Sequence, residues 1–221
     1  MTEIWHGPVR DQWQPAPLLD QQVVHRGGKW NVVVETAIIS GQEVKRDIVV
    51  HPGAVAIVAL DDSERVFLLR QYRQATGAYL FETPAGLLDE AVEEPLTAAR
   101  RELVEEAGIE AGRWQVLVDF LNSPGGSSEA IRIYLARDLT EAPHGRIHTG
   151  EAEEAELPGV WIDLEQAGEL VLSGELNNPT TVVGVLAALV ARRDNWSALR
   201  PANAPWEARN WLHEIGRLPL R

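Results

Sequence analysis

Short runs of β-branched residues alternate with turn signals near the N-terminus. Between Gln22 and Val50, runs rich in valine and isoleucine are separated by the sequences Gly-Gly-Lys and Ser-Gly-Gln-Glu. Short apolar runs bounded by glycine-containing turns are typical of strands that pair as hairpins. The pattern therefore predicts a small antiparallel β-sheet in this part of the chain.

Two further apolar runs, 54–60 and 66–72, flank the turn sequence Asp-Asp-Ser-Glu. This spacing predicts that the two runs pair with each other as neighbouring strands. The first run is apolar at every position, which is typical of a central strand buried on both faces. Later patterns predict strands at 114–120, 130–135 and 159–163, and helices at 164–173 and 179–193.

A helix is expected from about residue 94 to residue 107. Pro95 stands in its first turn, where the missing N–H costs no hydrogen bond, and Gly108 follows its end as a C-cap. Strands and helices therefore alternate, which predicts a mixed α/β domain. Apolar residues at helical spacing form the expected buried stripe of this helix, namely Leu96, Ala99, Leu103 and Ala107.

The composition is that of an ordinary globular protein, with 45% apolar and 24% charged residues in a chain of 221. We divide the chain into an N-terminal sheet region (1–48), a main domain (49–195) and a C-terminal tail (196–221). The tail is rich in tryptophan, and we expect it to cap the core or to lie at a subunit interface. Its tryptophans are Trp196, Trp206 and Trp211.

Charge and composition limit the partners that the chain can have. It contains no cysteine, so a metal would need oxygen or imidazole ligands, which favours Mg²⁺ or Mn²⁺. The net charge of −13 opposes binding of long nucleic acids. The N-terminus lacks a signal pattern, and the longest apolar stretch, 181–191, is far shorter than the roughly 20 residues of a membrane span. We therefore expect a cytoplasmic protein without nucleic-acid or membrane partners.

About half of the net negative charge lies in one short segment, 82–110. Within it, Glu105 and Glu106 lie three and four positions after Glu102, so the three side chains project from one side of the expected helix. Like charges at this spacing repel by about 0.2–0.5 kcal/mol per pair, whereas a divalent cation among them makes the cluster favourable. A solvated helix face is the alternative interpretation of such a run.

The segment resembles the signature of the Nudix hydrolases: a glycine, five residues, a glutamate, seven residues, then Arg-Glu, an apolar residue, any residue, Glu-Glu, any residue, Gly and an apolar residue. The second half matches with its spacing intact. In the first half, six residues rather than five separate Gly86 from Glu93. An extra residue in a loop costs little and leaves the helix unchanged. The matching positions are Gly86, Glu93, Arg101, Glu102, Leu103, Glu105, Glu106, Gly108 and Ile109.

The resemblance implies a Nudix-type α/β/α sandwich around a mixed β-sheet, with the small N-terminal antiparallel sheet as an appendage. It implies hydrolysis of a pyrophosphate bond with Mg²⁺ or Mn²⁺. Arg101 and Glu93 are implied to orient the site, and Glu105 could also hold bound water. The implied metal ligands are the carboxylates of Glu102, Glu105 and Glu106 and the carbonyl of Ala85.

Features outside this signature resemble the ADP-ribose pyrophosphatases. Arg73, in Leu-Arg-Gln-Tyr-Arg-Gln, matches an arginine that contacts the substrate phosphates, although an exposed strand charge is the alternative. Pro124 lies sixteen positions after Gly108, as in that subfamily. The loop that contains Pro124 could accommodate the terminal ribose, which makes Gly125 and Glu129 candidate substrate-binding residues.

The acidic stretch 150–159 resembles the subfamily loop that carries the catalytic base, which makes Glu154 the first candidate and Glu153 the second. The resemblance also implies that the N-terminal sheet forms an intertwined homodimer. In such a dimer, Trp30 could stack on adenine, and Arg46 could reach the substrate across the interface. An ordinary core or interface position is the alternative for Trp30.

These features predict hydrolysis of ADP-ribose to AMP and ribose 5-phosphate. The main alternative within the enzymes is hydrolysis of another nucleotide sugar or of a dinucleotide, because the signature says little about the base or the sugar. A non-catalytic ADP-ribose-binding module is the alternative from another class. Such a sensor would be expected to lose a signature glutamate or to gain a basic DNA-binding segment, and the sequence shows neither.

Overall fold

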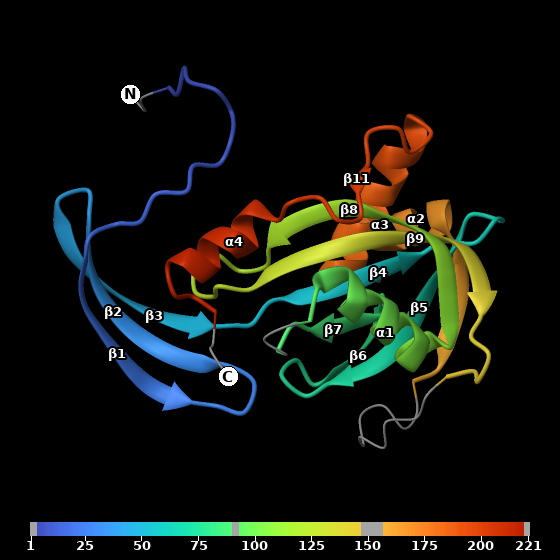
Figure 1. Ribbon diagram of the computed structural model, residues 1–221, viewed down its shortest axis with the longest axis horizontal. Coiled ribbons are helices and arrows are strands. Elements are labelled where there is room, and N and C mark those ends of the chain that lie inside the picture. Colours follow the sequence, from blue (N-terminus) through green and yellow to red (C-terminus); the bar gives the residue numbers. More distant parts are fainter. Residues whose placement is uncertain (1–3, 90–92, 147–156, 219–221) are drawn as a thin grey trace.

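The computed structural model describes residues 4–89, 93–146 and 157–218. A three-stranded antiparallel sheet forms the N-terminal part, in the order β1-β2-β3, and stands beside the rest of the molecule (Figure 1). Its strands are β1 (Leu18–Arg26), β2 (Asn31–Ile39) and β3 (Gln42–Val50). Ser40 and Gly41, which join β2 to β3, both have positive φ, as a two-residue hairpin turn requires. The predicted N-terminal sheet is confirmed.

The main body is built on a five-stranded mixed sheet in the order β11-β8-β9-β4-β7. Its interior strand β4 (Ala54–Ala59) is buried at every residue and lies parallel to β9 (Ala130–Glu141) and antiparallel to β7 (Ala85–Leu87). The prediction that this strand is buried on both faces is therefore confirmed, and it lies next to the central strand β9. The remaining strands are β8 (Ile109–Leu121) and β11 (Arg200–Pro201).

A second sheet has the order β10-β5-β6 and contains β5 (Arg65–Arg73), β6 (Ala78–Glu82) and β10 (Gly159–Asp163). The prediction that the runs 54–60 and 66–72 pair with each other is wrong, because only one isolated bridge, Leu60 to Val66, joins them. Both edges of β4 are already occupied by β7 and β9. β5 therefore diverges after the turn and pairs with β6 and β10.

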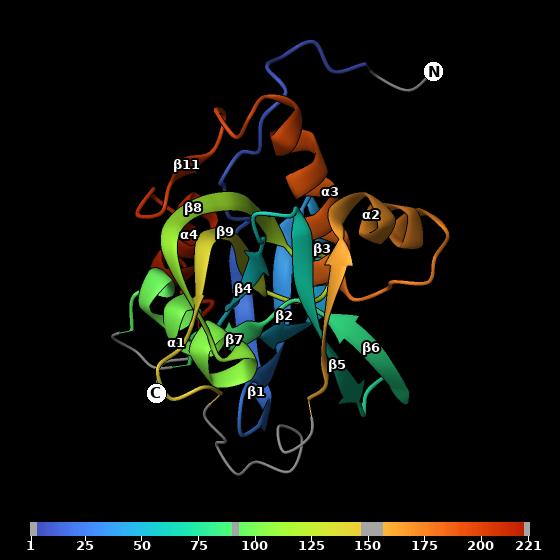
Figure 2. The ribbon, with the colours of Figure 1, turned by 90° about the vertical axis from the view of Figure 1, so that its right-hand side faces the viewer.

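Helices cover both faces of the five-stranded sheet, which gives an α/β/α sandwich (Figure 2). One core cluster contains α1 residues such as Leu103 and α4 residue Leu212, and the other contains α2 and α3 residues such as Leu164 and Val185. The fold is therefore the predicted α/β/α sandwich with an N-terminal antiparallel sheet. The helices are α1 (Pro95–Ala107), α2 (Leu164–Leu172), α3 (Pro179–Arg193) and α4 (Glu207–Glu214).

The C-terminal tail packs against the main sheet. Trp206 is only 4% exposed and belongs to the same core cluster as α1. The buried guanidinium of Arg132 on β9 donates to the carbonyls of Ala204 and Pro205 at 2.8 and 3.0 Å, and it pairs with Asp119 on β8 at 2.7 Å. These bonds satisfy a buried charge with acceptors from both the sheet and the tail. In the part of the chain that the structure describes, no helix has both the length and the apolar character needed to cross a membrane.

An ion pair connects the end of the tail to the N-terminal sheet. Glu35 on β2 is 4% exposed, accepts from Gln21 at 2.6 Å and is paired with Arg217. Burial alone would raise the pKa of Glu35, but the hydrogen bonds from Arg217 and Gln21 outweigh burial, and the net effect is a lowered pKa. The carboxylate therefore stabilises the fold above the unfolded pKa of about 4.5, and this stability is lost as the pH falls through the folded pKa.

We expect Glu35→Gln to lower the free energy of unfolding at pH 7 by about 1.5–3 kcal/mol, because hydrogen bonds to a charged partner are lost. The difference from the wild type should shrink when urea unfolding is repeated at progressively lower pH below about 4.5. Glu43→Gln, at an exposed position on β3, is the control. A difference that stays constant with pH would show that the charge of Glu35 does not contribute.

Candidate active site

Helix α1 has the boundaries that the sequence predicts. Glu94 is the N-cap residue and Pro95 the first helical residue, and the helix ends at Gly108, whose φ of 66° is left-handed. A side chain at Gly108 would place its Cβ 2.7 Å from the backbone nitrogen of Arg146. Glycine is therefore needed at this position both for the backbone conformation and for the close approach of the segment around Arg146.

The buried stripe of α1 differs in part from the expected one. Ala99 and Leu103 are fully buried as predicted, but Leu96 and Ala107 are only partly buried, and Ala98 and Glu106 are buried. Glu106 tolerates burial because its Oε2 accepts the backbone N–H of Ala85 at 2.8 Å. The helix therefore presents one carboxylate to β7.

Strand β7 lies directly against two of the signature glutamates. Besides the bond between Ala85 and Glu106, the carboxylate of Glu102 packs on Gly86 so closely that a Cβ there would lie 2.0 Å from Oε1. Only glycine leaves room for this contact. The structure thus brings together Ala85, Glu102 and Glu106, three of the four predicted metal ligands.

Arg101 connects three of the signature carboxylates. Its guanidinium donates to Glu93 at 3.1 and 3.0 Å, and to Glu102 and Glu105 at 2.8 Å each. The hydrogen bonds from Arg101 to Glu93, followed by the charges of Glu102 and Glu105, raise the pKa of Arg101 far above its usual value. One cation therefore offsets the repulsion among three clustered carboxylates.

The donor set fits a hard divalent cation. The side chains of Glu102 and Glu105 are 14% and 23% exposed, and Glu106 is 8% exposed, so carboxylate oxygens line a mostly buried edge beside β7. Among the described residues, no three His, Asp or Glu side chains already surround one point. Arg101 holds Glu102 and Glu105, so a bound cation would compete with its guanidinium for their oxygens.

Arg73 is connected to the chain that leads into β7 through an ion pair with Glu82. Its guanidinium makes a bidentate pair with Glu82, at 2.9 and 2.5 Å, across the β5–β6 hairpin. Glu82 is buried and lies three residues before Ala85, while the side chain of Arg73 is 44% exposed. An anion that approaches β7 would therefore meet an oriented guanidinium.

A second group of predicted residues gathers at the junction of the N-terminal sheet and the main body. The rings of Trp30 and His51 stack with centroids 5.4 Å apart, and His51 Nε2 lies 3.6 Å from Glu129 Oε1. Gly125 lies in the same loop as Glu129, and the next residue, Gly126, accepts the backbone N–H of Val49 at 2.9 Å. The sequence patterns do not single out His51, although its position three residues before the buried strand β4 is a usable signal.

The structure does not bring Arg46 to α1 within one chain. Arg46 is exposed, lies opposite Glu35 in the middle of the N-terminal sheet and donates to the carbonyl of Lys45. Figure 1 shows this sheet to one side of the main body, which contains α1. Glu153 and Glu154 lie outside the described residues.

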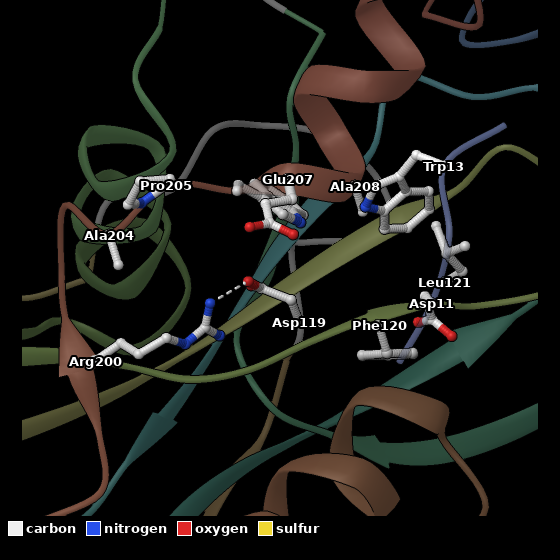
Figure 3. A pocket seen from close by; sticks show the side chains of 11 residues that line it. Asp11, Trp13, Asp119, Phe120, Leu121, Arg200, Ala204, Pro205, Glu207 and Ala208 are labelled. Atoms are coloured by element: carbon white, nitrogen blue, oxygen red, sulfur yellow. Dashed lines mark hydrogen bonds and ion pairs between the residues drawn. The ribbon is translucent and has the colours of Figure 1, made fainter. Parts of the chain in front are cut away.

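A hollow of about 440 Å³ lies between the N-terminal segment, β8 and the tail (Figure 3). Asp119 and Arg200 form an ion pair of 2.8 Å in its wall, and Trp13 and Glu207 also line it. None of the predicted site residues lines this hollow. The carboxylates beside β7 are therefore the better candidate for the active site.

The chain is similar to known proteins in both sequence and structure. The family model described as NUDIX domain matches residues 50–181. An ADP-ribose pyrophosphatase of Mycobacterium tuberculosis (strain ATCC 25618 / H37Rv) is 43% identical over 75% of this chain and 78% of its own length. An ADP-ribose pyrophosphatase of Bacillus subtilis (strain 168) is 34% identical over 69% of this chain and 80% of its own length.

A solved structure described as an ADP compounds hydrolase superposes with a TM-score of 0.68 at 24% identity, covering 95% of this chain and 100% of that chain. At this identity the likeness shows the fold. The family match and the similarity to the two pyrophosphatases show that the chain belongs to the NUDIX family. It is a Nudix hydrolase similar to ADP-ribose pyrophosphatases, and the predicted fold and enzyme class are confirmed.

We expect Gly86→Ala to lower kcat/KM by about 100-fold, because the new Cβ displaces the carboxylate of Glu102 by more than an ångström. The free energy of unfolding should change little, since the far end of a flexible side chain can move. Gly112→Ala is the matched control, because its Cβ would come no closer than 3.3 Å to Asp138. Equal kinetics for Gly86→Ala and Gly112→Ala would contradict a role for the contact between Gly86 and Glu102.

Proposed function

We propose that this protein hydrolyses the pyrophosphate bond of ADP-ribose, with AMP and ribose 5-phosphate as products and Mg²⁺ or Mn²⁺ as cofactor. The observation that carries the proposal is the group of carboxylates that α1 holds against β7, in a chain similar to two ADP-ribose pyrophosphatases. Hydrolysis of a pyrophosphate requires neutralisation of phosphate charge, a water in line with the leaving group and a base. The proposal assigns a candidate group to each requirement.

Glu102, Glu105 and Glu106 are the side chains that would hold the cation, with the carbonyl of Ala85 as a further ligand. A divalent cation bound there would supply positive charge for the phosphate oxygens and for an attacking water. Arg101 keeps the carboxylates oriented through its bonds to Glu93, Glu102 and Glu105. Arg73, oriented by Glu82, would bind the phosphates from the neighbouring strand pair.

A glutamate of the acidic segment before β10 would accept the proton of the attacking water, with Glu154 as the first candidate and Glu153 as the second. The described residues on either side of this segment are Arg146 and Leu157. Arg146 donates to the carbonyl of Leu157 at 3.2 Å and closely approaches Gly108 at the end of α1. Arg146 therefore lies next to the C-terminal end of the signature helix, and Leu157 is in contact with Arg146.

The remaining substrate contacts would come from the junction of the N-terminal sheet and the main body. Trp30 would stack on the adenine, and Gly125 and Glu129 would contact the terminal ribose. Arg46 would contribute from a second copy of the chain, in a homodimer formed through the N-terminal sheet. The exposed strand β1, with Leu18 and Val24 each 51% exposed, supports such pairing. If sedimentation equilibrium shows that the protein is a monomer, Arg46 does not contribute to the site.

The direct experiment measures AMP release from ADP-ribose, ADP-glucose, NADH, diadenosine polyphosphate and GDP-mannose with Mg²⁺, Mn²⁺ or EDTA. We expect metal-dependent cleavage with the highest kcat/KM for ADP-ribose. A higher kcat/KM for another member would assign the protein to the alternative class of nucleotide-sugar or dinucleotide hydrolases. Binding of ADP-ribose without any cleavage would favour the non-catalytic binding module.

We expect Glu154→Gln to lower kcat for ADP-ribose by about 10²–10⁴-fold, the usual contribution of a general base, with a smaller change in KM. Glu153→Gln is the matched neighbour and should retain most of the turnover. If Glu153→Gln is the slower protein, the roles of the two residues are reversed. Full turnover in both variants would exclude this segment as the source of the base.

A further inference from the structure

His51 is a buried imidazole at the joint between the N-terminal sheet and the main body. It follows β3, precedes β4 and is 7% exposed. Its backbone N–H donates to Ser128 Oγ at 2.9 Å, and its Nδ1 accepts the backbone N–H of Gly53 at 3.1 Å. The ring is therefore held by the backbone of the next turn, and the backbone of His51 is held by the loop that contains Glu129.

The bond from Gly53 determines the tautomer of the neutral ring. Because Nδ1 accepts, the proton of a neutral imidazole lies on Nε2. Burial lowers the pKa of His51, although the charge of Glu129 acts in the opposite direction. Nε2–H then faces Glu129 Oε1 at 3.6 Å, which is an electrostatic contact longer than a hydrogen bond.

The two neighbours of His51 are each fixed by a further contact. Glu129 Oε2 accepts from the side-chain amide of Asn122 at 2.6 Å. The turn that carries Trp30 is attached to the main body by the ion pair of Lys29 with Asp89, at 3.2 Å. Trp30 remains 44% exposed while one face of its ring lies on His51. The Trp30 ring and the Glu129 carboxylate thus both contact the His51 imidazole.

We propose that His51 is a positioning residue that holds the Trp30 ring and the Glu129 carboxylate as one rigid unit for binding the base and the terminal sugar of a nucleoside diphosphate sugar. This inference rests on the proposed function, in which Trp30 and Glu129 contact those parts. A ring held in place loses less conformational freedom on binding, so the rigid unit increases affinity without a new contact to the substrate. His51 acts on binding, whereas the carboxylates beside β7 act on the chemical step.

The test is the steady-state kinetics of ADP-ribose hydrolysis by the wild type and by His51→Ala, His51→Gln and His51→Phe. We expect His51→Ala to raise KM by about tenfold with kcat within about threefold, because an interaction made equally in the ground and transition states is lost. His51→Gln keeps a donor toward Glu129, and His51→Phe keeps a ring under Trp30. Each should restore part of the lost affinity.

In a protein that already carries Trp30→Ala and Glu129→Gln, the further change His51→Ala should raise KM by less than about twofold, since its partners are gone. His25→Ala, at an exposed position on β1, is the control and should leave KM within about twofold of the wild type. A purely structural role would instead lower kcat through a smaller folded fraction, with KM unchanged. An unchanged KM in His51→Ala, or an equal rise of KM in the double-variant background, overturns the inference.

Wild-type turnover of ADP-ribose tests the proposed function. The ratio of the KM of each variant to the KM of the wild type tests the positioning role of His51. Calorimetric titration with ADP-ribose in EDTA gives the corresponding Kd values without chemistry. A wild type that binds but does not cleave refutes the proposed function alone, while weaker binding by His51→Ala still supports the inference. Absence of binding by the wild type refutes both.

Discussion

The close contact of β7 with α1 is the constraint on which the site depends. The Ala85 N–H bonds to Glu106, and Gly86 leaves room for the carboxylate of Glu102. These contacts require β7 to pair with the buried strand β4, which holds its position because both of its edges are occupied and both of its faces are covered. Pairing with β4 thus sets the position of β7, and contacts with β7 set the positions of the Glu102 and Glu106 carboxylates. The clustering of like charges is tolerated because Arg101 connects Glu93, Glu102 and Glu105.

Local signals in the sequence predict the helix of the site well. Pro95 and Gly108 mark both ends of α1, because missing donors and left-handed backbone are properties of single residues. The prediction that the runs 54–60 and 66–72 pair with each other was wrong. Strand partners depend on distant segments such as β9, which compete for the same edge of β4. The apolar stripe also does not predict that Glu106 is buried, because its hydrogen-bond partner, the backbone N–H of Ala85, comes from β7.

Long-range contacts explain what the sequence does not reveal about substrate recognition. His51 lies far along the chain from Trp30 and Glu129, so no spacing rule links the three residues, and only the folded chain brings them together. The same holds for Arg217, which reaches Glu35 from the opposite end of the chain. The tail and the loop around Glu129 therefore anchor the N-terminal sheet to the domain that carries the carboxylates. The region proposed for binding and the region proposed for chemistry are therefore held in a defined relation by the fold.

The most direct test of the central claim, that α1 and β7 together hold a divalent cation against a pyrophosphate, is the anomalous diffraction of crystals soaked with Mn²⁺ and a non-hydrolysable ADP-ribose analogue. We expect an anomalous peak within about 2.0–2.6 Å of oxygens of Glu102 and Glu106, the range for hard cations with oxygen ligands. The peak should also contact the diphosphate of the analogue. Diphosphate bound elsewhere, or a Mn²⁺ peak away from these two glutamates, would contradict the account.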